Sequence, residues 1–209
     1  MLLALMIAYV VTLVYLAITE RFRHYALLIG LQGWLLLGIA LLSLHAVDWT
    51  ELAFVVAETL VFKAVVVPAL LTGIIRRTGI NRVHARSVAV FNQLVLSLLA
   101  LLCSLVLTYY LADPDVDRVF FGVALYALLS GMLLIISHKR IFSHLVGFLV
   151  IENGVFLFSM AIGVEMPFLI NIAILLDILM SVLMLGLFIG KIGSRLHDLS
   201  AERLTELKD

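Results

Sequence analysis

Residues 88–111 read VAVFNQLVLSLLALLCSLVLTYYL, a run of 24 positions without a charged side chain. A helix needs about 20 mainly apolar residues to cross the hydrocarbon core of a bilayer, which is about 30 Å thick. The polar residues Gln93, Ser97, Ser104 and Thr108 fall on one face of this helix, which is typical of a surface that packs against other membrane helices. The stretch therefore predicts a membrane-spanning helix.

The composition of the whole chain supports the same interpretation. The 209 residues are 64% hydrophobic and 13% charged, and the mean hydropathy is +1.21. A soluble domain carries about 25% charged residues, and a small globule must still present a polar exterior. We therefore expect an all-α, polytopic membrane protein and not a soluble enzyme. The formal net charge of zero gives no indication of a nucleic-acid partner.

Seven stretches are long and apolar enough to form spans. We expect membrane helices at residues 2–18, 25–44, 52–75, 88–111, 119–137, 141–163 and 167–191, joined by short loops. The first stretch has no basic leader, so it is interpreted as a span and not as a cleavable signal peptide. The expected organisation is a four-helix region at 1–111, a three-helix region at 119–191 and a cytoplasmic tail at 192–209. The tail is either a short amphipathic helix or a frayed terminus.

Basic residues indicate how these spans are oriented. Twelve of the 14 lysines and arginines fall on one side of the expected membrane: Arg21, Arg23, Arg76, Arg77, Arg82, Arg86, Lys139, Arg140, Lys191, Arg195, Arg203 and Lys208. The other side has Arg118, beside the acidic loop at 113–117. Because cytoplasmic loops collect lysine and arginine, we expect the N-terminus outside and the C-terminus in the cytoplasm.

Four ionisable residues lie within the expected spans: Glu58, Lys63, Glu152 and Asp177. At about 1.5 Å per residue, Lys63, Glu152 and Asp177 lie near the bilayer midplane, and Glu58 is shallower. A charge at that depth costs about 3 kcal/mol on insertion scales, so such residues pair or line a water pathway. This layer predicts lateral proton transfer, although a plain structural pairing between helices is the alternative for each residue.

Other features near this layer are open to more than one interpretation. Asn153 and Gly154 are expected to loosen the helix after Glu152, and Pro68 is expected to kink the third span. His144 is a candidate proton shuttle to Glu152, while a histidine without function at the interface is the more common case. The sequence contains no nucleotide-binding loop, nucleophile elbow or Ser/His/Asp arrangement. It also has no Cys/His pairs at metal-ligand spacing.

Three segments resemble the hydrogenase-4 component E family. Residues 144–154, HLVGFLVIENG, resemble its GY–x–x–MENG stretch, residues 172–178, IAILLDI, its IATDAIF segment, and residues 62–68, FKAVVVP, its TK–x–x–x–VP segment. The ending LTELK at 204–208 is similar to the family's LT–x–LK. The first two spans match no motif of the family, and Ile151 stands where the family has methionine.

The resemblance implies a context and roles for the buried charges. Component E belongs to complex I-like membrane-bound nickel–iron hydrogenase and formate hydrogenlyase assemblies in the cytoplasmic membrane of prokaryotes. Its last three spans resemble the K subunit of complex I and the C subunit of Mrp-type sodium/proton antiporters. By this resemblance, Glu152 and Asp177 would belong to a chain of charged residues between the redox module and antiporter-like subunits.

The expected function is therefore that of a non-catalytic, ion-translocating membrane subunit. Glu152, Asp177 and Lys63 would form the proton pathway, with Glu58 and His144 in secondary roles. The expected partners are antiporter-like subunits, a quinone-oxidoreductase-like membrane anchor and a soluble nickel–iron and iron–sulfur module, and no cofactor or metal is expected in this chain. A subunit of an Mrp-type antiporter and a purely structural tether are the alternatives. The choice between H⁺ and Na⁺, the direction of transport and the electron donor stay open.

Overall fold

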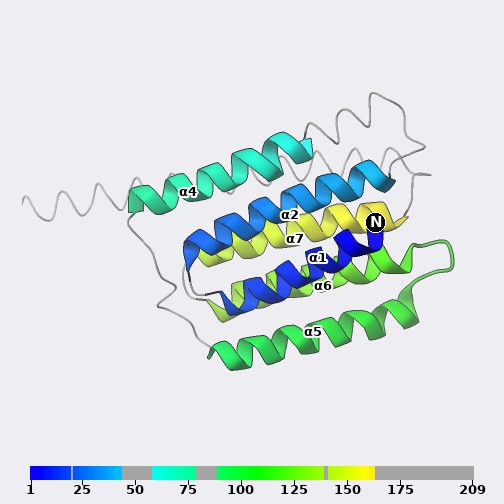
Figure 1. Cartoon of the computed structure of the whole chain (residues 1–209). Coiled ribbons are helices and arrows are strands. Elements are labelled where there is room, and N and C mark those ends of the chain that lie inside the picture. Colours follow the sequence, from blue (N-terminus) through cyan, green and yellow to red (C-terminus); the bar gives the residue numbers. More distant parts are fainter. Residues whose placement is uncertain (20, 44–57, 79–88, 139–140, 163–209) are drawn as a thin grey trace, which may run out of the picture. The chain divides into compact units, whose positions relative to one another are not determined.

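All regular elements of the described residues are helices (Figure 1). A computed structural model of the chain describes residues 1–19, 21–43, 58–78, 89–138 and 141–162, which belong to one unit, Met1–Ile174. The elements are α1 (Leu2–Ile18), α2 (Phe22–Ser43), η1 (Glu58–Val66), α4 (Val67–Thr78), α5 (Val90–Leu111), α6 (Arg118–Ser137) and α7 (Ile141–Ile162). The expectation of an all-α chain is confirmed for this part of the protein.

Four of these helices are long and apolar enough to cross a membrane: Phe22–Ser43, Val90–Leu111, Arg118–Ser137 and Phe142–Ile162. Leu2–Ile18 and Lys63–Gly73 are shorter apolar helices. The helix ends lie within three residues of those expected for the first, second, fourth, fifth and sixth spans. The seventh expected span, 167–191, and the tail, 192–209, lie outside the described residues. The number of spans, their orientation and the division into helical regions stay predictions.

The third expected span changes helix type along its length. Residues 58–66 form the π-helix η1, and α4 continues from Val67 as an α-helix. Pro68 stands directly after this change. Proline has no N–H group, so it cannot bond the carbonyl of the preceding turn, and π-helical segments are often found where the regular ladder is interrupted. The irregular segment carries Lys63.

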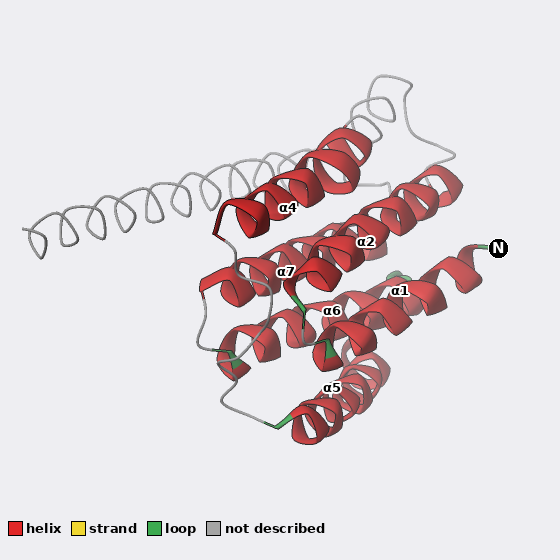
Figure 2. Cartoon of the chain, turned by 60° about the vertical axis from the view of Figure 1, so that its left-hand side comes forward, coloured by secondary structure: helices red, strands yellow, loops and turns green. Residues whose placement is uncertain are grey.

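Helix α2 connects the two sides of this unit. It packs against α1, α7, η1 and α4, while α5 packs against α1 and α6 (Figures 1 and 2). Helices α5 and α4 therefore form opposite edges of the described unit, with the other long helices between them. The links from α1 to α2, α5 to α6 and α6 to α7 are short, so these consecutive helices run antiparallel.

Glycines bring α6 and α7 into backbone contact. A Cβ atom at Gly131 would lie 2.5 Å from the Gly147 carbonyl oxygen, and one at Gly147 would lie 2.7 Å from the Gly131 carbonyl oxygen. A Cβ at Gly154 would lie 3.1 Å from the Leu128 nitrogen. Small residues allow this approach between membrane helices. The expectation that Asn153 and Gly154 loosen the helix is wrong, because α7 is α-helical throughout Ile141–Ile162 and Gly154 serves close packing instead.

Helix α5 buries its polar side chains and exposes its apolar ones, the reverse of a helix on the surface of a soluble protein. Its buried residues are Gln93, Ser97, Ala100, Ser104 and Thr108, so the expected packing role of the polar face is confirmed. Its outer face carries large apolar side chains, among them Phe91 at 72% and Leu102 at 58% exposure. Water would penalise this arrangement, whereas lipid accepts the outer face and helix contacts satisfy the inner one.

Candidate functional site

Two of the charged residues expected within spans are buried in the described bundle. Lys63 of η1 and Glu152 of α7 are each 7% exposed. Lysine and glutamate are almost never buried unless they are paired, and both have interactions inside the structure. Both side chains lie inside the bundle of apolar helices, and their expected depth in a bilayer stays a prediction.

The ammonium group of Lys63 lies over the aromatic ring of Phe156, which is one helical turn from Glu152. The Nζ atom lies 4.6 Å from the centroid of the Phe156 ring. Phe156 follows Glu152 by four positions, so the two side chains lie on the same face of α7, one turn apart. A desolvated cation–π contact is worth about 2 kcal/mol, which offsets much of the cost of about 3 kcal/mol for a charge deep in a membrane. The structure thus brings Lys63 to the part of α7 that carries Glu152.

The backbone of α2 fixes the position of Lys63. A Cβ atom at Gly33 would lie 2.7 Å from both the carbonyl carbon and the carbonyl oxygen of Lys63, and 2.8 Å from the Ala64 nitrogen. A Cβ at Gly30 would lie 3.1 Å from Cγ of Pro68. Only glycine at position 33 allows α2 and η1 to approach this closely, so α2 sets how far Lys63 extends toward α7.

A chain of buried polar side chains crosses three helices beside Glu152. The Asn153 Nδ2 atom donates to Oε1 of Gln32 at 3.3 Å, and the Gln32 Nε2 atom donates to Oγ1 of Thr12 at 3.1 Å. The Thr12 hydroxyl in turn donates to the Tyr9 carbonyl at 2.6 Å. Gln32 is fully buried. These bonds join α1, α2 and α7 at the level of the residue that follows Glu152.

The sequence places hydroxyl groups within two helical turns of the buried charges, at Thr59, Ser159 and Ser181, and those that the structure describes differ in what they contact. Ser159 is buried, but its Oγ donates to the Phe156 carbonyl at 2.7 Å, so this hydroxyl is used within α7. Thr59 of η1, four positions before Lys63, is fully buried and has a partner in the structure. Ser181 lies outside the described residues. The Ser159 hydroxyl is therefore engaged within its own helix.

The other predicted site residues are only partly covered. Glu58 is the first residue of η1, and its side chain is not among those described. Asp177 lies outside the described residues. His144 is half-buried, and its Nε2 atom lies 2.6 Å from the His138 carbonyl oxygen, so it closes the corner between α6 and α7. A role for His144 in feeding Glu152 stays a prediction.

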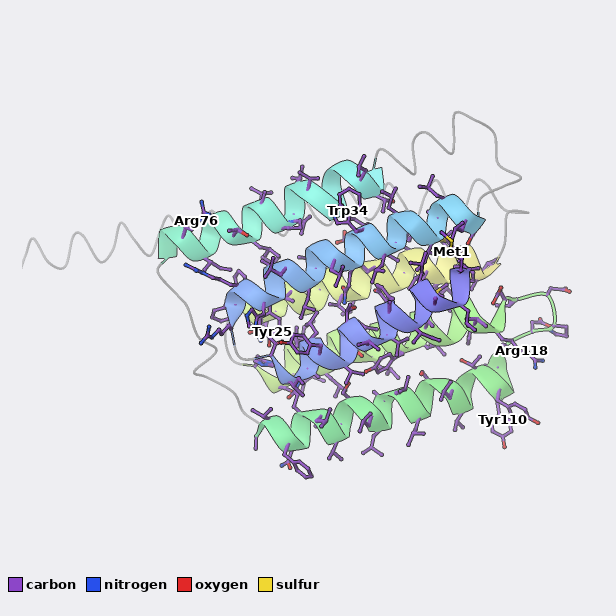
Figure 3. The ribbon with its side chains drawn as sticks, in the orientation of Figure 1. Met1, Tyr25, Trp34, Arg76, Tyr110 and Arg118 are labelled. Atoms are coloured by element: carbon purple, nitrogen blue, oxygen red, sulfur yellow. The ribbon has the colours of Figure 1, made fainter. Side chains whose placement is uncertain are left out.

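Sequence reasoning missed a second group of polar residues at that corner. His138 is 2% exposed, its Nδ1 atom lies 2.9 Å from the Leu134 carbonyl oxygen, and its Nε2 atom lies 3.4 Å from the Tyr25 hydroxyl. Tyr25, at the start of α2, is fully buried and lies at the same end of the bundle as Arg76 (Figure 3). The available signal was the place of His138 directly after an apolar run. It gave no reason to pair it with Tyr25, 113 positions earlier.

Gln32 was missed for a related reason. A fully buried glutamine in the middle of the apolar run at 25–44 is a signal of an interhelical hydrogen bond. Its partners Thr12 and Asn153 come from distant parts of the sequence.

The arrangement is suited to moving or storing charge. A buried acid, a buried base and a polar chain across three helices can exchange or orient protons. Among the residues that the structure describes, no group of three or more His, Cys, Asp or Glu side chains could hold a metal ion. The expected absence of a cofactor stays a prediction.

Comparisons with known proteins add no assignment to this geometry. The chain was compared with protein-family models, with curated proteins and with solved structures, and none of these comparisons found a match.

Proposed function

We propose that this chain is an ion-translocating membrane subunit of a complex I-like hydrogenase assembly, and that protons pass through Glu152. Lys63 would tune the charge of Glu152, and Asp177 would be the next carrier. The redox chemistry would belong to a soluble nickel–iron and iron–sulfur module, with antiporter-like subunits beside this chain. The proposal places the protein in the cytoplasmic membrane of a prokaryote.

The burial of Glu152 and Lys63 on facing helices carries this proposal. Each is 7% exposed, and the Lys63 ammonium lies over Phe156, one helical turn from Glu152. A carboxyl group inside apolar helices is destabilised in its charged form, and a nearby ammonium stabilises that form again. Opposed effects of this kind allow a carboxyl group to bind and release a proton. The family resemblance of residues 144–154 supports the same role.

Proton uptake by vesicles that contain the complete complex tests the proposal. Glu152→Gln keeps the size and hydrogen-bonding capacity of the side chain but cannot ionise. We expect it to abolish proton uptake, measured with a pH-sensitive dye, while the subunits still co-purify. Glu152→Asp, which retains a carboxyl group, is expected to retain part of the uptake. Normal uptake by Glu152→Gln would show that the carrier role is wrong.

An exposed carboxylate provides the matched control. Asp115 lies in the exposed loop between α5 and α6, so Asp115→Asn removes one negative charge without touching the buried site. We expect this variant to take up protons at the normal rate. Equal losses in Asp115→Asn and Glu152→Gln would attribute the effect to net charge and would contradict a specific pathway through Glu152.

The contact of Lys63 with Phe156 favours a second candidate, a structural tether. A cation held over an aromatic ring stabilises helix packing without any proton transfer. Under this alternative, Lys63→Met lowers the yield of assembled complex, and the assembled fraction transports protons normally. Under the first candidate, the assembled Lys63→Met complex has reduced uptake. Measuring uptake per assembled complex separates the two.

A further inference from the structure

An apolar cleft lies between α1, α5 and α6, away from Lys63 and Glu152. Its volume is about 500 Å³, within the range of about 300–1,000 Å³ found for small-molecule sites. The lining comes from residues 3–11 of α1, 101–109 of α5 and 118–126 of α6. Each stretch covers eight residue steps, so the cleft runs for about 12 Å along the helices at 1.5 Å per residue. The long axis of the cleft, called the channel below, is therefore parallel to the helix axes.

Three hydroxyl groups in the walls of this cleft, those of Ser104, Thr108 and Tyr126, have partners within the protein. The Ser104 hydroxyl donates to the Leu101 carbonyl at 2.8 Å, and the Thr108 hydroxyl donates to the Ser104 carbonyl at 2.7 Å. The Tyr126 hydroxyl lies 2.7 Å from Oγ of Ser97. The other lining residues below the mouth are almost all aliphatic. Because satisfied hydroxyls and aliphatic side chains offer water few partners, the cleft suits a hydrocarbon chain.

Arg118 lies at one end of the cleft, at the first position of α6. Met1, Tyr110 and Arg118 lie at the same end of the described bundle, opposite Tyr25 and Arg76 (Figure 3). Arg118 is exposed, and in the described part of the chain its side chain makes no hydrogen bond or ion pair. A cation at a helix N-terminus is disfavoured by the helix dipole. Arg118 thus holds an unneutralised guanidinium at the mouth of an apolar channel.

The loop before Arg118 adds acidic groups beside this cation. Asp113 and Asp115 are exposed in the loop between α5 and α6. The Asp117 carboxylate is already engaged, since its Oδ1 accepts from the Val119 and Phe120 nitrogens at 2.8 and 3.2 Å. The six positions 113–118, which end with Arg118 at the mouth, therefore carry one guanidinium and, besides the capping Asp117, two exposed carboxylates. This pattern complements a zwitterionic headgroup with a phosphate and an ammonium.

We propose that the cleft between α1, α5 and α6 binds an ethanolamine phospholipid. One acyl chain lies in the channel, the phosphate accepts hydrogen bonds from Arg118, and the ammonium faces Asp113 and Asp115. This site is separate from the proposed proton pathway.

Native mass spectrometry of the full chain, purified in mild detergent and given defined phospholipids, tests the site. The probes are phosphatidylethanolamine and phosphatidylglycerol, which share the phosphate but differ in the ammonium group. We expect retained phosphatidylethanolamine to exceed phosphatidylglycerol. Arg118→Gln is expected to lower retention about tenfold, because a charge-assisted hydrogen bond to phosphate is lost. Arg76→Gln, an exposed arginine at the other end of the bundle, is expected to leave retention unchanged.

A matched pair on α5 tests the channel itself. Leu105 and Leu102 are 57% and 58% exposed, but only Leu105 lines the cleft. We expect Leu105→Trp to fill the channel and reduce retention, and Leu102→Trp to leave it unchanged. Equal retention by the two variants would overturn the proposal. So would preferred retention of phosphatidylglycerol by the unmodified chain, or crosslinking that places another protein segment against Leu105.

The acidic loop provides a readout of headgroup choice. The double substitution Asp113→Asn and Asp115→Asn is expected to remove the preference for phosphatidylethanolamine and to raise phosphatidylglycerol retention. An unchanged preference in this variant would overturn the assignment of the ammonium site. Since the measurement is lipid retention, its outcome does not depend on whether Glu152 carries protons.

Discussion

Asn153 of α7 donates a hydrogen bond to Gln32 of α2, with 3.3 Å between Nδ2 and Oε1 across 121 positions of sequence. Gln32 in turn donates a hydrogen bond to Thr12 of α1. Asn153 is the direct neighbour of Glu152, so this bond fixes the face of α7 that carries the acid. The polar chain thus ties the proposed proton carrier to the first two helices of the protein.

The energy of this bond can be measured with a double-mutant cycle. We expect Gln32→Leu and Asn153→Leu to destabilise the protein singly, and the double variant to cost less than the sum. Interhelical hydrogen bonds in membrane proteins give coupling energies of about 0.6 kcal/mol, and up to about 1.7 kcal/mol. Unfolding in mixed detergent micelles measures the free energy of unfolding of the unmodified chain and of the three variants. Additive effects would mean that the two amides do not interact.

Gly33 and Gly73 form a matched pair for testing the contact between α2 and η1. Gly33→Ala places a methyl group 2.7 Å from the Lys63 backbone, so we expect a loss of about 1–3 kcal/mol from overpacking. A Cβ at Gly73 meets nothing within 4 Å, and replacing an interior helix glycine by alanine gains about 0.5–1 kcal/mol. Thermal unfolding in detergent should therefore shift in opposite directions. A stabilised Gly33→Ala variant would contradict the close approach.

Cys103, the single cysteine of the chain, reports on whether α5 faces lipid. It is exposed and lies 13 residues into α5, about 20 Å along the helix axis. In intact membranes we expect a lipid-soluble maleimide to label Cys103 and a charged maleimide to leave it unlabelled. Asp115→Cys in a Cys103→Ser background should react with the charged reagent from the outside. Labelling of Asp115→Cys from the cytoplasmic side alone would reverse the predicted orientation.

The cap of α6 gives a prediction about the loop at the cleft. Asp117 accepts hydrogen bonds from the Val119 and Phe120 nitrogens. Asp117→Ala should cost about 1 kcal/mol of stability, the usual loss for an N-cap residue. Asp117→Asn retains an acceptor oxygen and should cost much less. Similar losses in both variants would show that the charge, and not the cap, holds the loop.

The helix ends could be predicted from the sequence because charged residues lie at them. Arg118 and the acidic loop mark the start of α6, and Lys139 and Arg140 separate it from α7. Apolar length between such markers is enough to place a membrane helix within a few residues. The same argument predicted that Lys63 and Glu152 lie inside helices, and both are buried in helices of the structure; their depth in a bilayer stays a prediction.

The partners of the buried groups could not be predicted in the same way. Helix α2 is apolar on nearly all sides, so its pattern does not show which face turns inward. Gln32 therefore gave no indication of Thr12 or Asn153. Phe156 is one of several phenylalanines in α7, and nothing in its sequence context distinguishes it as the ring beneath Lys63. The π-helical form of residues 58–66, which pack against α2, was likewise not predicted from the sequence.

The backbone contact between Gly131 and Gly147 limits how water can reach Glu152. At that contact even a methyl group would come within 2.5 Å of a carbonyl oxygen, so no water molecule fits between α6 and α7 there. A hydrated route to the carboxyl group cannot pass between the two helices at that level. Two described neighbours bring polar side chains to α7: α2 through Gln32 and η1 through Lys63. A proton path through this subunit would accordingly be closed to water on the α6 side of α7 at the level of Gly131 and Gly147.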